Sequence, residues 1–97
     1  MEFEKGSIVE LYEGAENKYI ILNNMEKNDM KYILAAIWKD TSVIKDVITQ
    51  SMNNGFSDIV LIEHNPKTNT FKFSSDKSII VEIVYKTLEE ENMQDYM

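Results

Sequence analysis

Short apolar runs separated by polar clusters dominate the first third of the chain. Residues 7–12 are rich in β-branched and aromatic side chains and lead into a polar, glycine-containing cluster at residues 13–17. Two similar apolar segments follow at residues 18–22 and 31–35, with the polar residues 23–29 between them. Because such runs bounded by polar clusters are typical of strands, we predict three strands here, the second and third as antiparallel neighbours.

The third of these segments is apolar at every position from residue 32 to 38. Successive side chains of a strand point to opposite faces of a sheet, so both faces of this strand are apolar. One face would carry Tyr32, Leu34, Ala36 and Trp38, and the other Ile33, Ala35 and Ile37. We therefore predict that this strand lies in the centre of the sheet.

Beyond Asp40 the apolar residues recur at steps of three and four, which is the period of a helix. These residues are Val43, Ile44, Val47, Ile48 and Met52. Thr41 or Ser42 can supply an N-cap, and Gly55 can adopt the left-handed backbone conformation that ends a helix. We predict a helix from about residue 41 to 53.

Strand character returns in the second half of the chain. We predict strands at residues 58–63 and 70–74, joined by a polar, proline-containing hairpin loop at residues 65–69. In the second of these strands, Phe71 and Phe73 would share one face. We expect both side chains to contribute to the core, as most phenylalanines do in a domain of this size.

The last element has conflicting signals. Residues 78–88 are rich in β-branched side chains, which favours a strand, and this is the interpretation we prefer. A helix capped by Ser75 or Asp76 is the alternative. Residues 89–97 carry several carboxylates and few apolar groups, so we expect a flexible acidic tail.

Together these elements predict one small domain over residues 1–97, of the α+β class and mainly β. The expected architecture is a curved antiparallel sheet or a small, SH3-like, partly open barrel of five to six strands. One helix is expected to cover an open face of the sheet. Such a sheet would leave an unpaired edge strand, either the first strand or the Phe71 strand, which can accept a partner's strand or mediate a homodimer.

Charge and composition narrow the function classes. Seventeen acidic and ten basic residues give a net charge of −7, and none of the basic residues is arginine. An acidic chain repels nucleic acid, so direct nucleic-acid binding is disfavoured. No apolar run approaches the roughly 20 residues of a membrane span, and no signal-peptide pattern is visible. We expect a cytoplasmic protein without cysteine chemistry.

The candidates for chemistry are few. The chain has one histidine, His64, beside Glu63, but neighbours on a strand face opposite ways, and zinc needs three or four suitable ligands. Ser42 and Lys45 match the Ser-x-x-Lys pattern of acyl-transfer enzymes without its companion motifs. We therefore expect no catalytic residues, no metal and no cofactor, and favour a helix cap with a solvated lysine.

Aromatic and acidic side chains indicate binding to another protein. Tyrosine and tryptophan are enriched at interface hot spots, and Trp38 stands where the central strand would leave the sheet, a place for an exposed anchor. The predicted partner-binding residues are Tyr12, Tyr19, Trp38, Tyr85, Glu13 and Glu16. We predict a non-catalytic adaptor, chaperone or immunity protein. The alternative is an acidic, phage-type inhibitor that blocks a nucleic-acid-binding site of a host or defence protein.

A resemblance points the same way. The segments that carry it are residues 5–11 (Lys-Gly-Ser-Ile-Val-Glu-Leu), residues 18–22 (Lys-Tyr-Ile-Ile-Leu), and Phe71-Lys72-Phe73 with residues 75–77 and 83–85. They are similar to segments of small bacterial accessory proteins encoded beside LXG-type toxins of type VII secretion systems. The resemblance implies a cytoplasmic, chaperone-like protein that binds a toxin or a secretion partner.

Overall fold

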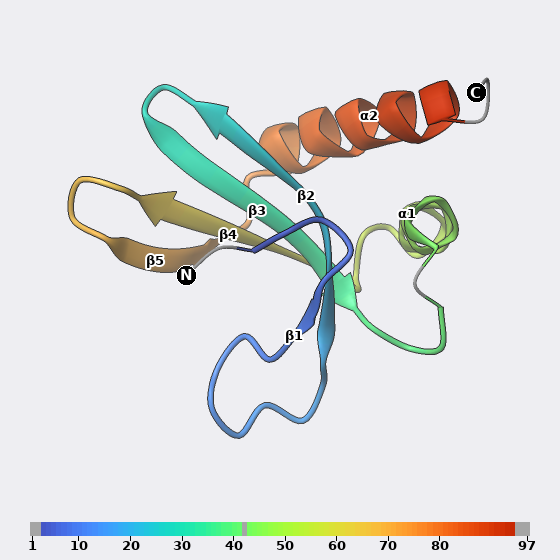
Figure 1. Cartoon of the computed structure of the whole chain (residues 1–97), viewed down its shortest axis with the longest axis horizontal. Helices are drawn as coiled ribbons and strands as arrows, with labels where there is room; N and C mark the ends of the chain where they lie inside the picture. Colours follow the sequence, from blue (N-terminus) through green and yellow to red (C-terminus); the bar gives the residue numbers. More distant parts are fainter. Residues whose placement is uncertain (1–2, 42, 95–97) are drawn as a thin grey trace.

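A computed structural model of the chain describes residues 3–41 and 43–94. Figure 1 shows an antiparallel sheet curled into a half-barrel, with helices packed on one side. The elements in chain order are β1 (Ile8–Val9), β2 (Tyr19–Lys27), β3 (Met30–Ile37), α1 (Ile44–Asn53), β4 (Ile59–Asn65), β5 (Thr70–Ser74) and α2 (Lys77–Gln94). The predicted α+β, mainly β class is confirmed. Two helices are present among the described residues, however, where one was predicted.

The sheet follows the chain, because the strand order is β1-β2-β3-β4-β5 and all neighbours are antiparallel. The prediction that β3 is central is confirmed. The β2–β3 hairpin is longer than expected, because residues 23–27 extend β2 up to a tight turn. Asn28 and Asp29 form this turn with φ angles of 53° and 67°, the left-handed pair that matches the twist of a hairpin.

Each face of the sheet carries its own core, because apolar residues alternate along the central strands. The core on the helix side consists of Ile20, Leu22, Leu34, Ala36, Val47, Ile48, Leu61, Ile79, Ile80, Ile83 and Val84. The core on the opposite face is smaller and consists of Ile21, Ile33, Ala35 and Ile62, with Phe3, Val9, Leu11, Tyr19 and Val60 packed around it. The N-terminal segment, rather than a helix, covers this second face.

Helix α1 confirms the prediction for residues 41–53 apart from its first turn. The helix begins at Ile44. Its N-cap residue is Val43, whose side chain makes no capping hydrogen bond. The hydroxyl of Thr41 accepts a hydrogen bond from the Val43 backbone N–H at 3.1 Å, while Ser42 lies outside the described residues. At the other end Gly55 has φ +64°, as expected for the residue that ends the helix.

Helix α2 corrects the strand predicted for residues 78–88. The buried residues Ile79, Ile80, Ile83 and Val84 lie one, three and four positions apart, and in a helix this spacing places them on one stripe against the sheet. The side chain of Asp76 caps the helix by accepting hydrogen bonds from the backbone N–H groups of Ser78 and Ile79 at 3.0 and 3.4 Å. Tertiary packing and a strong cap outweigh the strand preference of β-branched residues.

The same helix changes the interpretation of the acidic C-terminal residues. Residues 89–94, expected in a flexible tail, continue α2, and Glu91 pairs with Lys5 at 2.8 Å. Residues 95–97 lie outside the described part of the chain. Within residues 3–41 and 43–94, neither helix has the length and apolar character needed to cross a membrane.

A buried polar cluster joins α2 to the sheet at an irregularity in β2. The β2–β3 register shifts between Ile21 and Asn23, so that Asn23 turns towards α2. Its side-chain amide donates to the hydroxyl of Thr87 at 2.8 Å and to the carboxylate of Glu90 at 3.2 Å. Asn23 and Thr87 are 6% and 0% exposed, so these hydrogen bonds satisfy groups that have left water.

Candidate protein-binding groove

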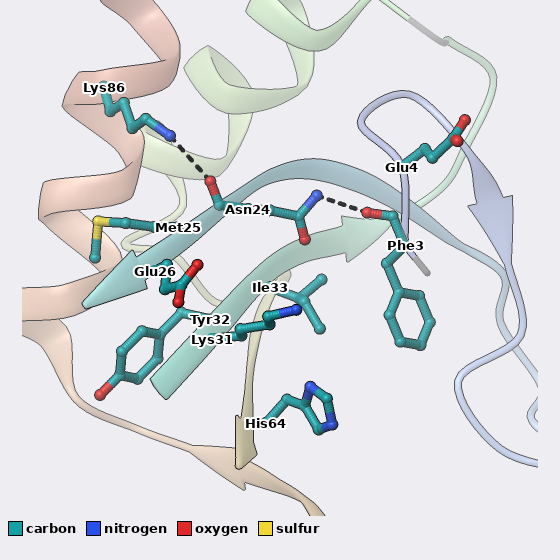
Figure 2. Close-up of a pocket in the computed structure, with 10 residues that line it drawn as sticks. All are labelled: Phe3, Glu4, Asn24, Met25, Glu26, Lys31, Tyr32, Ile33, His64 and Lys86. Atoms are coloured by element: carbon teal, nitrogen blue, oxygen red, sulfur yellow. Dashed lines mark hydrogen bonds between the residues drawn. The ribbon is translucent and has the colours of Figure 1, made fainter. Parts of the chain in front are cut away.

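The N-terminal segment, residues 3–6, crosses the face of the sheet that the helices leave open (Figure 1). The Gly6 backbone N–H donates to the Ile21 carbonyl at 2.7 Å. Figure 2 shows the second attachment, in which the side-chain amide of Asn24 donates to the Phe3 carbonyl at 2.6 Å. These bonds hold the Phe3 backbone over the sheet.

An ion pair with α2 adds to this attachment. Burial of Lys5 acts to lower the pKa of its ammonium group, but the hydrogen bond and charge of Glu91, together with those of Glu90, outweigh this effect. The pKa of Lys5 is therefore raised above 10.5, and the ammonium is charged at neutral pH. The pair is partly exposed, so we expect it to orient the segment more than to stabilise the fold.

A largely apolar cavity of about 390 Å³ opens beside this segment, and we call it the groove. It is lined by Phe3, Leu11, Tyr12, Ile62, Phe71, Lys72 and Phe73. The base of the groove is formed by β4 and β5. In their register Ile62 pairs with Phe73, and His64 pairs with Phe71. Tyr12, Phe71 and Phe73 keep 57%, 43% and 63% of their surface exposed.

The exposure of Phe71 and Phe73 corrects the expectation that they belong to the core. β5 ends the strand order, so a neighbouring strand covers it on one side only. Its phenylalanines point to the face without helices. There the rings of Phe71 and Phe3 pack edge-on, with their centroids 6.2 Å apart. Among the described residues, large aromatic surface is thus left uncovered beside the unpaired edge of β5.

The loop that contributes Tyr12 to the groove also carries exposed carboxylates. A turn at residues 12–15, closed by the Ala15 N–H and the Tyr12 carbonyl at 3.2 Å, presents Tyr12 next to the exposed carboxylate of Glu13. Glu10 and Glu16 are exposed in the same connection between β1 and β2, and we call Glu10, Glu13 and Glu16 the acidic rim. Lys72 of β5 also lines the groove. The site therefore combines an apolar floor with carboxylates in the loop that carries Tyr12.

A second, more polar cavity of about 410 Å³ lies on the other side of Phe3 (Figure 2). Glu26, Lys31 and His64 are register neighbours on β2, β3 and β4, so they form a row across it. The His64 ring stacks on Phe71 with centroids 4.2 Å apart, and its Nε2 lies within hydrogen-bond distance, 3.1 Å, of the Asn69 side-chain oxygen. His64 is thus engaged in supporting the β4–β5 hairpin.

A metal site and the Ser-x-x-Lys pair are the other candidates for chemistry. Among residues 3–41 and 43–94, no three His, Cys, Asp or Glu side chains gather as metal ligands would. In the Ser-x-x-Lys pair, Ser42 lies outside the described residues, and Lys45 is exposed on α1. The His64 ring contacts Phe71 and Asn69, so its interactions belong to the β4–β5 hairpin.

The structure separates the residues predicted to bind a partner. Tyr12 lines the groove, Glu13 and Glu16 belong to the acidic rim, and Tyr19 packs half-buried against the core on the same face. Tyr85 is 64% exposed on α2, away from the groove lining. These residues therefore belong to more than one surface.

Trp38 differs from the exposed anchor expected at the end of the central strand. It is half-buried and packs against the core on the helix side. Its indole N–H is buried and has no hydrogen-bond partner among the described residues. A side chain in this position supports the fold.

Phe3, Leu11, Phe71 and Phe73 line the groove but were not predicted from the sequence as binding residues. One signal could have located the last two, because a Phe-x-Phe strand at the end of a meander lies at an edge once the next element is a helix. Comparisons of the chain with protein-family models, with curated protein sequences and with solved structures each found no match. The function is therefore inferred from the geometry of the groove.

Proposed function

We propose that this protein is a non-catalytic binding module that recognises a partner protein through the groove. The observation that carries the proposal is the exposed aromatic set Tyr12, Phe71 and Phe73 around one apolar cavity. Contiguous apolar surface of this kind marks interaction sites, and aromatic residues dominate binding energy at interfaces. An adaptor, a chaperone and an immunity protein all share this requirement for a partner.

The expected energetic contribution of Phe73 is large for one side chain. An aromatic side chain buries about 150–250 Å² when it is fully covered. With 63% of Phe73 exposed, a partner that covered it would remove about 120 Å² from water, which corresponds to about 3 kcal/mol at 25 cal/mol per Å². Partial coverage still predicts that truncation of Phe73 weakens binding at least tenfold.

The acidic surface gives weaker support to an inhibitor that imitates nucleic acid. Several carboxylates are already paired with lysines: Glu91 with Lys5 at 2.8 Å, and Glu82 with Lys27 at 2.9 Å. Pairing reduces the charge that these groups can offer to a basic site. Binding through such a site would weaken steeply as salt rises, whereas binding through the groove should weaken less with salt and should depend on Phe73.

The test compares two equally exposed aromatic residues in the full chain. Phe73→Ala removes a groove residue, and Tyr85→Ala removes an aromatic side chain of α2 that is 64% exposed. Wild-type and variant chains are immobilised and used to capture proteins from the native host, and captured partners are quantified by mass spectrometry. We expect a stoichiometric partner that Phe73→Ala loses and that Tyr85→Ala retains.

Two outcomes contradict the proposal. Retention of every partner by Phe73→Ala, with circular dichroism showing a folded chain, would exclude the groove as the binding site. Loss of the partner in 0.5 M salt by wild type, with no effect of Phe73→Ala, would favour the acidic inhibitor. Because both residues are exposed, we expect unfolding midpoints of both variants close to wild type.

A further inference from the structure

We propose that the groove accepts an extended segment of the partner, which pairs with the free edge of β5 as an additional strand. The segment would place apolar side chains at alternate positions into the groove and carry lysine or arginine beside them. This inference rests on the proposed function, and it specifies the backbone geometry and the chemistry of the partner.

The first argument is the free edge itself. In the described part of the chain, β5 stands last in the strand order and pairs with β4 alone. The N–H and C=O groups that point away from β4 are therefore available to an incoming strand. β5 spans five residues, Thr70–Ser74, which offers a pairing length of about 17 Å at 3.4 Å per residue.

The second argument is the position of the groove relative to this edge. Phe71 and Phe73 project into the groove from β5, while Leu11, Tyr12 and Phe3 line it from the segments that flank β1. A strand added about 4.8 Å from β5 brings its groove-facing side chains opposite Phe71 and Phe73. Successive residues of a strand alternate in direction, so every second partner residue should be apolar.

The third argument concerns charge and favours a partner over a second copy of this chain. In an antiparallel β5–β5 dimer centred on residue 72, Lys72 would face the same lysine of the other copy. Like charges directly opposite each other destabilise a strand pair, and edge lysines oppose this kind of association. The acidic rim of Glu10, Glu13 and Glu16 instead attracts a basic segment to a chain whose net charge is −7.

The experiment uses the full chain and a synthetic probe peptide, Lys-Val-Thr-Phe-Thr-Val-Lys, which has alternating apolar residues and basic ends. Amide hydrogen exchange of the chain is followed by NMR with and without the peptide. We expect exchange of outward-facing β5 amides to slow at least tenfold. Two N-methylated peptides serve as controls. In each of them the backbone N–H groups along one edge of the extended peptide are methylated and cannot donate hydrogen bonds. Because only one edge can pair with β5, we expect at least one of the two peptides to lose binding.

Variants of chain and peptide distinguish this inference from the proposed function. We expect Phe73→Ala to weaken peptide binding at least tenfold, Tyr85→Ala to leave it unchanged, and a peptide with glutamate in place of its lysines to bind at least tenfold less tightly. If Phe73→Ala weakens binding while the β5 amides stay unprotected and both N-methylated peptides still bind, strand addition is wrong and the groove function stands.

Other results overturn the assignment of the partner. Protection of β5 amides that rises with chain concentration in the absence of peptide would identify a second copy as the occupant. Equal affinity of the lysine and glutamate peptides would exclude the acidic rim as a determinant. If the lysine peptide leaves β5 exchange unchanged, the inference fails, whatever partner Phe73→Ala loses in the capture experiment.

Discussion

Replacement of Thr87 by valine should destabilise this protein although the two side chains have nearly the same shape. The Thr87 hydroxyl accepts a hydrogen bond from the Asn23 amide at 2.8 Å and donates to the Ile83 carbonyl at 2.7 Å. Thr87 is 0% exposed, so water cannot replace the lost acceptor. The side-chain NH2 group of Asn23 would then keep only its longer contacts to the two Glu90 carboxylate oxygens, at 3.2 and 3.5 Å.

The expected cost follows from these contacts. A hydrogen bond contributes about 0.5–1.5 kcal/mol net, and a buried polar group left without its partner costs about 1–3 kcal/mol. Because Glu90 compensates in part, we expect Thr87→Val to lower the free energy of unfolding by about 1–2 kcal/mol. For a domain of this size, the thermal midpoint should fall by roughly 5–15 °C.

The chain contains a matched control. Thr49 also donates its hydroxyl to the carbonyl four residues earlier, that of Lys45, at 2.9 Å, but it does so on the exposed face of α1. Thr49→Val makes the same chemical change without disturbing a buried contact, and should stay within about 0.5 kcal/mol of wild type. Urea unfolding followed by circular dichroism measures both variants.

A double-mutant cycle then assigns the effect to the Asn23–Thr87 contact. We expect Asn23→Leu and Thr87→Val to be less than additive, with a coupling energy of about 1 kcal/mol, because each removes the same hydrogen bond. The reasoning is refuted if Thr87→Val costs no more than Thr49→Val, or if the two substitutions in the cycle are additive.

Two further predictions concern a cap and a turn. Hydrogen bonds from the Ser78 hydroxyl and from the N–H groups of Ser78 and Ile79 hold the pKa of Asp76 below 3.8. This stabilisation is present above pH 3.8 and is lost as pH falls through the lowered value. The urea midpoint of Asp76→Ala should therefore lie below that of wild type at pH 7, and the difference should shrink as the pH is lowered below 3.8. Equal midpoints at pH 7 would exclude the cap. Asp29→Gly should raise the free energy of unfolding by about 0.5–1 kcal/mol, because glycine adopts a φ of 67° without strain; a lower thermal midpoint would contradict this.

The predictable part of the fold is the part in which local pattern and tertiary packing agree. The apolar run at residues 32–38 identified the central strand because a strand covered on both faces needs apolar residues at every position. The helix at residues 44–53 followed from its spacing and from Gly55. In α2 the two signals conflict, since Ile79, Ile80 and Ile83 favour a strand locally, whereas their spacing suits a helix that packs on the sheet.

The candidate site was predicted only in part, for a related reason. Tyr12, Glu13 and Glu16 were selected by residue type. In the structure Tyr12 lines the groove, and Glu13 and Glu16 are exposed in the loop that carries Tyr12. Phe71 and Phe73 were assigned to the core because hydrophobicity alone does not tell which strand is last in a sheet. That depends on α2, so the error in the final element caused the error in the site.

The position of the single tryptophan has a practical consequence. Trp38 packs on the helix side of the sheet with its indole N–H buried, while the groove lies on the opposite face. Its fluorescence should therefore be a native optical reporter of the helical layer, with emission that shifts to longer wavelength when α1 and α2 detach from the sheet. The Trp38 emission should not change when a ligand binds in the groove. A change in emission during titration with a groove ligand would therefore show that the two faces of the sheet are coupled.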